Sequence, residues 1–155
     1  MESLPSAETT MIYWFTGQPG SGKTTLALAV QKELRRRGHA VVFLDGDTFR
    51  IITLNKDYST DGRLKNIRAA QLLAAKIHED GVWVVASFVS PYRDLREEFK
   101  QRPEVREIYV HTAARRGREK YFVEGYEPPL ENFLDIDTTS ASVEDCVQRI
   151  LDAKA

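Results

Sequence analysis

Short apolar runs recur along the chain, and each contains almost no polar residue. They lie at residues 11–15, 40–44, 82–86 and 108–110. Because such a run offers no polar face to water, it predicts a strand that is buried on both faces of a sheet. The sheet is therefore expected in the interior of the molecule.

Stretches with apolar positions three to four residues apart alternate with these runs, a spacing that predicts helices. They are residues 25–37, 62–79, 90–100 and 142–153. Gly38 and Gly81 each precede an apolar run, and both suit the left-handed residue that ends many helices. The alternation predicts an α/β fold of the three-layer P-loop NTPase type, a parallel sheet with helices on both faces.

The length of 155 residues suits one domain, which we expect to span residues 1–155. An apolar fraction of 42% with 29% charged residues excludes disorder as the main state. Residues 1–10 are expected to form a flexible N-terminus. Residues 111–132 combine charges and aromatic residues with Pro128-Pro129 and show little periodicity, so we expect a loop or lid there.

The balance of charges bears on which partners and which location we expect. Lys and Arg total 22 against 23 Asp and Glu, a net charge of -1, so no bulk attraction to nucleic acid or to an anionic membrane is expected. The one cysteine, Cys146, excludes an internal disulfide, and no apolar run reaches the roughly 20 residues that span a bilayer. Residues 1–10 lack the order of a secretory signal. We expect a cytoplasmic protein.

Residues 17–24, GQPGSGKT, match the phosphate-binding pattern G-x-x-x-x-G-K-[ST]. They follow the first apolar run directly and precede the first helical stretch, which is the context that this pattern requires. Glycines let the backbone bend so that its N–H groups point at an anion, and the helix adds its positive N-terminal end. We therefore expect a nucleoside triphosphate site; the alternative is a glycine-rich turn without a ligand.

Side chains of this loop have separate expected roles. Lys23 would reach the β- and γ-phosphates as a point charge and act in catalysis, and the Thr24 hydroxyl would coordinate Mg²⁺, the expected cofactor. The expected ATP-binding residues are Gly17, Gly20, Ser21, Gly22, Lys23, Thr24 and Thr25.

Features of two other nucleotide-dependent classes are missing. Asn55-Lys56-Asp57 lacks one residue of the N-K-x-D motif with which GTPases read their base, and it comes too early in the chain. The apolar run at 82–86 ends in Ser87-Phe88, without the acid that a hydrolysing ATPase uses to hold metal and water. Hydrolysis is therefore not the expected reaction.

An acidic pair follows the second apolar run instead. Residues 45–47 read Asp-Gly-Asp, and Arg50 comes one helical turn later. Because the carboxyl ends of parallel strands share one edge of the sheet, Asp45 and Asp47 are expected to face the same crevice as the phosphate loop. The alternative is a simple turn, for which Asp-Gly is a common pair.

Taken in order, these motifs resemble the adenylylsulfate kinase family. The resemblance covers roughly residues 11–110 and 126–152. It rests on the segments WFTG at 14–17, the phosphate loop, LDGD at 44–47, LNKD at 54–57, NIR at 66–68, SFVSPYR at 87–93, YEPP at 126–129 and DT at 137–138.

The resemblance implies roles for residues outside the phosphate loop. Asp45 would be the catalytic base, or the anchor of a metal-bound water, near the attacking 3′-hydroxyl. Tyr58 takes the place of an aromatic residue that stacks on the acceptor base in the family. The implied acceptor-binding residues are Asp47, Arg50, Tyr58, Arg63, Asn66, Val89 and Ser90. Ser90 also suits the N-cap of the helix expected at 90–100.

The lid departs from the family's pattern. Residues 111–125, HTAARRGREKYFVEG, contain neither the family's Arg-Asp-x-Lys-Gly-Leu-Tyr run nor its Phe-Thr-Gly aromatic clamp, and the lid is shorter by roughly twenty residues. A lid must place positive charge against the transferred phosphoryl group. Of the lid cations Arg115, Arg116, Arg118 and Lys120, we expect Arg115 or Arg118 to do so.

The resemblance implies an ATP-dependent kinase that phosphorylates the 3′-hydroxyl of adenosine 5′-phosphosulfate, a small-molecule nucleotide acceptor. The divergent lid leaves a different acceptor open, such as a cytidine diphosphoramidate. A nucleotide-binding module without turnover is a further alternative, whereas a polynucleotide kinase would want a basic channel, which the net charge of -1 does not favour. The family also suggests a homodimer as a possible assembly.

Overall fold

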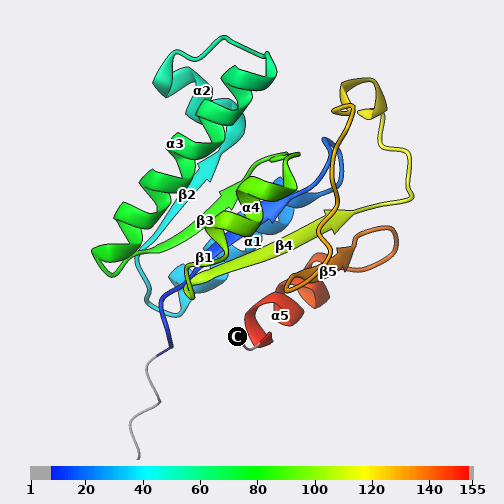
Figure 1. The fold of residues 1–155 in the computed structure, drawn as a ribbon. Coiled ribbons are helices and arrows are strands. Elements are labelled where there is room, and N and C mark those ends of the chain that lie inside the picture. Colours follow the sequence, from blue (N-terminus) through cyan, green and yellow to red (C-terminus); the bar gives the residue numbers. More distant parts are fainter. Residues whose placement is uncertain (1–7, 154–155) are drawn as a thin grey trace, which may run out of the picture.

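Five parallel strands form the middle layer of the computed structural model, which describes residues 8–153 (Figure 1). Across the sheet their order is β2-β3-β1-β4-β5. They are β1 (Ile12–Thr16), β2 (Val41–Asp45), β3 (Trp83–Ser87), β4 (Val105–His111) and β5 (Leu134–Asp137). Each of the four apolar runs overlaps one of the first four strands, so these predictions are confirmed.

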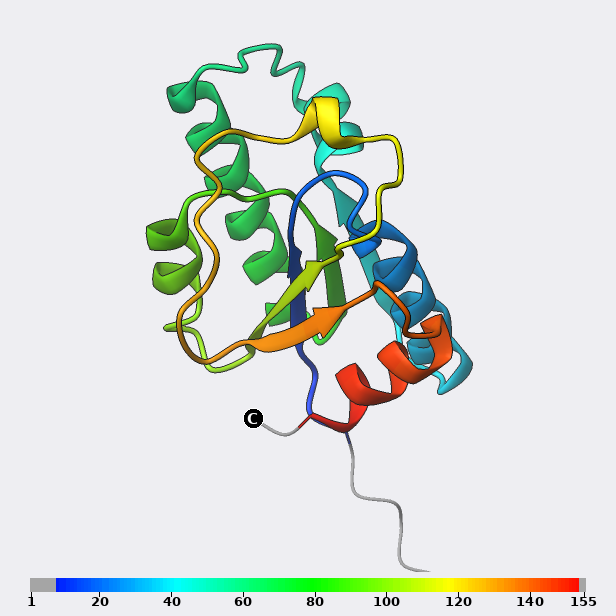
Figure 2. The ribbon, with the colours of Figure 1, turned by 90° about the vertical axis from the view of Figure 1, so that its right-hand side faces the viewer.

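Helices cover both faces of the sheet, which confirms the expected fold class (Figure 2). One face carries α1 (Lys23–Arg36) and α5 (Val143–Asp152), and the other carries α2 (Gly46–Thr53), α3 (Thr60–Glu79) and α4 (Arg93–Phe99). A single turn of 3₁₀ helix, η1 (Glu119–Tyr121), lies in the expected lid region. Within residues 8–153, no helix has the length and apolar character that crossing a bilayer requires.

The alternation of side chains along β1 shows why this strand is apolar throughout. Tyr13 and Phe15 belong to the core beneath α1 and α5, whereas Ile12 and Trp14 belong to the core beneath α3 and α4. All four are buried. Both faces of the strand therefore exclude water, as the continuous run predicts.

Three local structures differ from the sequence predictions. β5 was not predicted, because only Ile136 of its four residues is buried and the other three do not form an apolar run. α2 begins directly at Gly46, so the acidic pair lies at a helix N-terminus and not in a simple turn. α4 begins at Arg93 and not at the Pro91 turn, because Ser90 adopts a left-handed backbone with φ of 46° and does not cap the helix.

The start of the chain is predicted to be flexible over residues 1–10. Residues 1–7 lie outside the described residues. Glu8 forms an ion pair with Arg37, and the Thr10 carbonyl is 2.9 Å from the imidazole of His78. The flexible N-terminus stays a prediction.

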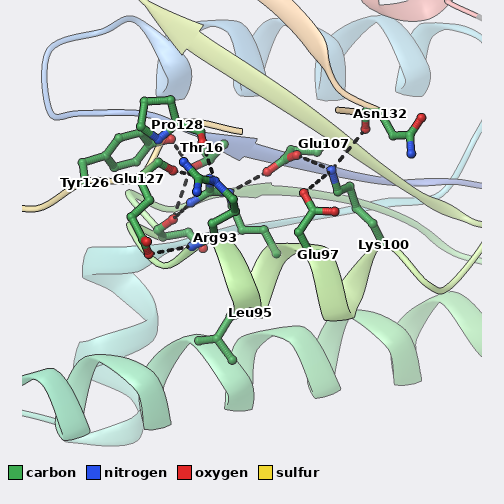
Figure 3. A network of polar contacts seen from close by, with 12 residues as sticks. Thr16, Arg93, Leu95, Glu97, Lys100, Glu107, Tyr126, Glu127, Pro128 and Asn132 are labelled. Carbon is green, nitrogen blue, oxygen red and sulfur yellow. Dashed lines mark hydrogen bonds and ion pairs between the residues drawn. The ribbon is translucent and has the colours of Figure 1, made fainter. Parts of the chain in front are cut away.

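A buried ion pair joins α4 to β4 (Figure 3). The Arg96 guanidinium donates to the Glu107 carboxylate at 2.5 Å, and both side chains are 1% exposed. Arg96 also donates to the main-chain carbonyls of Ser90 and Glu127, and Lys100 adds a second cation 2.7 Å from Glu107. These contacts hold the segment after β3 and the segment around Glu127 against the sheet.

Replacing Arg96 tests how much this pair stabilises the fold. We expect Arg96→Met to lower the free energy of unfolding by about 3 kcal/mol, because Glu107 loses a buried cation and two carbonyls lose their donor. Urea denaturation monitored by circular dichroism measures the change. The matched control is Arg68→Met, which removes an exposed ion pair with Glu98 and should change stability by less than about 0.5 kcal/mol. Equal effects of the two variants would contradict the assignment.

Candidate active site

The loop from Gly17 to Thr24 leaves β1 and enters α1 through residues in left-handed conformations. Gly20 has φ of 81° and Gly22 has φ of 99°. A Cβ atom at Gly20 would also lie 2.9 Å from the Cβ of Arg118, so a side chain there would collide with the lid. Glycine is required at these positions both for the backbone conformation and for the approach of the lid.

Backbone N–H groups at the start of α1 are available for an anion. Leu26 donates the first helical hydrogen bond, to the Gly22 carbonyl at 3.0 Å, so the N–H groups of residues 23–25 precede the hydrogen-bonded part of the helix. The first turn contains no acidic residue that would occupy them. This arrangement, with the positive end of the helix dipole, suits a phosphate group.

Lys23 lies at the same point, and its side chain is largely buried. Its ammonium group donates to the Gln18 carbonyl at 3.3 Å. Burial lowers the pKa of Lys23 to about 8, with a smaller lowering by Arg118 and an opposing effect of Asp47. The protein therefore holds this cation at a cost in hydration that a bound anion would relieve.

A cleft of about 670 Å³ opens where β1, β2 and β3 end. Asp45 is paired with Ser87 in the sheet, and Ser87 is paired with Phe15, so the carboxyl ends of the strands meet at one edge. Apart from the lid cations, the predicted residues that line this cleft are Gly20, Gly22, Lys23, Thr24, Thr25, Asp45, Asp47 and Val89. Gly17 and Ser21 are buried within the loop and do not line it.

The Asp45 carboxylate is held by the first turn of α2. Its two oxygens accept hydrogen bonds from the backbone N–H of Thr48 at 2.7 Å and from the Thr48 hydroxyl at 3.0 Å. Asp45 is thus the N-cap of α2, and the cap fixes the direction in which the carboxylate points. The spacing of an acid and a threonine three residues apart is a capping signal that the sequence contains, but Thr48 was not among the predicted site residues.

Two hydroxyl groups face one another across the cleft floor. The Thr24 hydroxyl lies 3.0 Å from that of Ser87, which occupies the strand end where a hydrolysing ATPase has an acid. A Thr24 hydroxyl that donates to Ser87 keeps a lone pair for a cation. Mg²⁺ commonly takes only one or two protein oxygens and completes its shell with phosphate oxygens and water, so this donor set fits it. Among the described residues, no three His, Cys, Asp or Glu side chains form a metal cage.

Other predicted acceptor residues lie outside the lining of the cleft. The Arg50 guanidinium packs 4.1 Å from the centre of the Tyr58 ring and donates to the main-chain carbonyls of Asn55 and Asp57. Arg50 therefore organises the loop that carries Tyr58. The Tyr58 ring remains 65% exposed, which leaves aromatic surface for stacking on a base.

Arg63, Asn66 and Ser90 are likewise not part of the lining. Asn66 and Ser90 are 5% and 2% exposed, and the Asn66 Oδ1 and Ser90 Oγ atoms have no hydrogen-bond partner. The structure thus places these two predicted residues in the protein interior.

The lid places two arginines at the cleft, and one of them differs from the favoured pair. Arg118 lines the cleft, whereas Arg115 does not. Arg116 lines it as well, and its guanidinium donates to the Ser21 carbonyl at 3.2 Å and to the Thr138 carbonyl at 2.8 Å. Neighbouring residues in an extended loop point in different directions, so the composition of the lid could not distinguish these side chains.

The remaining chemistry-bearing residues that the sequence contains lie elsewhere. Cys146 is buried in the core beneath α5, and burial raises the pKa of its thiol. Trp14 and Trp83 are core residues, as their strand positions predict.

Comparisons with known proteins agree with this geometry. The family model for adenylylsulphate kinase matches residues 9–130. An adenylyl-sulfate kinase of Bacteroides fragilis is 34% identical, an alignment that covers 92% of this chain and 81% of the relative, and one of Chloroflexus aurantiacus is 32% identical over 99% and 93%. The Mycobacterium tuberculosis APS kinase CysC, solved with AMPPNP and APS, has the same fold with a TM-score of 0.81, 22% identity and coverage of 92% and 96%.

The alignment with the Bacteroides relative extends over 164 positions but contains 92% of the 155 residues, so about twenty of its positions have no counterpart in this chain.

The lowered pKa of Lys23 predicts how nucleotide affinity depends on pH. A bound triphosphate favours the charged ammonium, so it raises the pKa above its value of about 8 in the free protein. Affinity for ATP should be constant below pH 8 and fall, by up to tenfold per pH unit, above it. Calorimetric titrations from pH 7 to 9.5 measure this.

The control for this prediction is Lys23→Met. It should bind ATP weakly, with an affinity that does not change over the same pH range. A wild-type affinity that is constant up to pH 9.5 would contradict the predicted link.

Proposed function

The chain belongs to the adenylylsulphate kinase family, and on this premise we propose that it transfers the γ-phosphoryl group of ATP to the 3′-hydroxyl of adenosine 5′-phosphosulfate. The observation that carries the proposal is the shared cleft: Lys23, at the phosphate loop, and Asp45, at the end of the neighbouring strand, line the same cavity. Phosphoryl transfer needs a donor phosphate and an acceptor hydroxyl in one dry, positively charged space.

The donor side uses backbone and cations together. The N–H groups at the start of α1 would bind phosphate oxygens, and Lys23 would contact the β- and γ-phosphates. Arg118 lines the cleft from the lid and lies near enough to Lys23 to lower its pKa. These positive groups would stabilise the charge on the equatorial oxygens of the transferred group.

Asp45 would act on the acceptor hydroxyl. The 3′-oxygen forms the new bond to phosphorus, the bond between the γ-phosphorus and the bridging oxygen breaks, and ADP leaves with that oxygen. The hydroxyl proton must leave during the transfer, and the Asp45 carboxylate would accept this proton. The two contacts from Thr48 would keep the carboxylate aimed at this hydroxyl.

Thr24 would hold Mg²⁺, with Ser87 orienting its hydroxyl. When bound, the cation neutralises charge on the β- and γ-phosphates. Asp47 would add negative charge near the same point, since it lines the cleft and is close enough to Lys23 to oppose the lowering of its pKa.

Acceptor recognition would involve the surface around α2 and α3. Tyr58, held by Arg50, would stack on the acceptor base, and Val89 would line the cleft beside it. The buried Asn66 and Ser90 would support this surface from within, together with the half-buried Arg63. The single domain, the cytoplasmic location and the homodimer remain predictions from the sequence and the family.

An acceptor screen tests the proposal. The protein is incubated with ATP and Mg²⁺, first alone and then with adenosine 5′-phosphosulfate or a cytidine diphosphoramidate, while ADP release is followed. We expect rapid release only with adenosine 5′-phosphosulfate, because the family match covers the donor site and most of the acceptor surface. Release with the cytidine compound would reassign the acceptor. No release with either would favour a binding module without turnover.

Substitutions at Asp45 and Lys23 separate chemistry from binding. Asp45→Asn should lower kcat by about 10² to 10⁴-fold with ATP affinity largely retained, because it removes the group that receives the hydroxyl proton and leaves the phosphate loop intact. Lys23→Ala should lower both kcat and the affinity for ATP. Steady-state kinetics and calorimetry measure these effects, with Asp152→Asn, at the end of α5, as a control that leaves both unchanged.

A further inference from the structure

The lid is attached to the phosphate loop through Gln18, a residue in a position that the loop pattern leaves free. The Gln18 Nε2 atom donates to the Val123 carbonyl at 2.9 Å, and the Val123 N–H donates to Gln18 Oε1 at 2.8 Å. One side chain thus satisfies both main-chain polar groups of a residue 105 positions away. Both contacts are partly buried, where hydrogen bonds are less exposed to competition from water.

Arg116 anchors the other end of the same segment. It donates to the carbonyls of Ser21 and Thr138, and Thr138 itself donates to the Ser21 carbonyl at 2.5 Å. The segment from Arg116 to Val123 is therefore held to the phosphate loop at both ends. Figure 2 shows this part of the chain, drawn in yellow, crossing above the carboxyl ends of the strands.

Arg118 lies between the two anchors. Its Cβ and Cγ atoms pack against Gly20, its guanidinium lies 5.1 Å from the centre of the Tyr121 ring, and it lines the cleft. Within residues 8–153, the Arg118 guanidinium forms no ion pair and no hydrogen bond with another side chain. Its position therefore depends on the backbone that carries it.

We propose that Gln18 is a positioning residue, which binds both main-chain polar groups of Val123 and so keeps the shortened lid closed over the phosphate loop with Arg118 directed at the transferred phosphoryl group. This inference rests on the proposed kinase function for the role of Arg118. A lid held in this way keeps water from the reacting phosphate.

Replacing Gln18 by a side chain of similar length without polar atoms tests the proposal. In Gln18→Met, hydrogen exchange at the Val123 amide, measured by mass spectrometry without nucleotide, should become about 5- to 30-fold faster, the factor that one or two modest hydrogen bonds represent. ATP hydrolysis without acceptor should rise relative to phosphoryl transfer by about tenfold, because water enters the opened site.

The second variant breaks the contact from the lid. Val123→Pro removes the N–H that Gln18 accepts, and Phe122, with φ of -58° and ψ of 136°, already has the conformation that precedes proline. It should change the ratio of hydrolysis to transfer in the same direction as Gln18→Met. Val123→Ala keeps both main-chain groups, so it should leave exchange and the ratio unchanged.

A third measurement separates nucleotide binding from phosphoryl transfer. Because Arg118 would act on the transferred phosphoryl group, a released lid should lower kcat by a larger factor than it raises the KM for ATP. A purely structural effect of Gln18→Met would lower the melting temperature without lowering kcat.

Two outcomes would overturn the proposal. Unchanged exchange at Val123 in Gln18→Met would show that the contact does not hold the lid. An unchanged ratio of hydrolysis to transfer, with faster exchange, would show that the closed lid does not protect the reacting phosphate. If the wild-type protein phosphorylates no acceptor, the proposed function fails, but the exchange measurement still decides whether Gln18 holds the lid.

Discussion

Binding an anion at the phosphate loop requires backbone N–H groups that no other part of the protein uses. We call the loop of residues 17–24 and the free N–H groups of residues 23–25 the anion cradle, and the arrangement of the strands and helices around it follows from this requirement. The N–H groups lie at the start of α1, where a helix has no internal acceptors for them. Left-handed glycines aim them inward, and β1, buried on both faces, fixes the point from which the loop departs. Since all five strands are parallel, Asp45 and Ser87 reach the same edge of the sheet as the loop. The cradle therefore determines where the acceptor must come.

Backbone N–H groups carry partial positive charge and repel cations, so the cations that share the site with them need support of their own. Lys23 is buried at the loop, and its lowered pKa records the cost of that burial. Arg116 donates hydrogen bonds to the Ser21 carbonyl of the loop and to the Thr138 carbonyl, and it thereby anchors the lid to the loop. Arg118 is left as the lid cation that lines the cleft without such partners. Two arginines with one residue between them thus have different roles: Arg116 binds the loop, and Arg118 faces the phosphate site.

Much of this arrangement is readable from the sequence, because it depends on local patterns. Continuous apolar runs predicted four strands, and the loop motif in its strand and helix context predicted the cradle. β5 escaped prediction because its residues alternate between charge and core at the sheet edge. The roles of Arg96 and Gln18 could not be predicted from local patterns, because their partners are set by tertiary packing. Gln18 binds a residue 105 positions away. In the sequence nothing distinguishes Arg96 from the other charged residues, and only the fold shows that it pairs with the buried Glu107. The sequence likewise could not say whether Arg115, Arg116 or Arg118 faces the cleft, because an irregular loop has no period.

The contacts of the lid with the phosphate loop affect both the closing of the site and the release of product. Ordering each loop residue costs about 1 to 2 kcal/mol of backbone entropy, so a long lid that orders only on substrate must recover that cost from substrate contacts. Here contacts with the phosphate loop order the segment between Arg116 and Val123, so substrate contacts need not offset the entropy cost of ordering it. The same contacts oppose opening of the lid. Release of ADP must therefore either break the hydrogen bonds of Gln18 or take place at the side of the cleft that the lid does not cover. A short closed lid therefore favours protection of the phosphoryl group over rapid release of product.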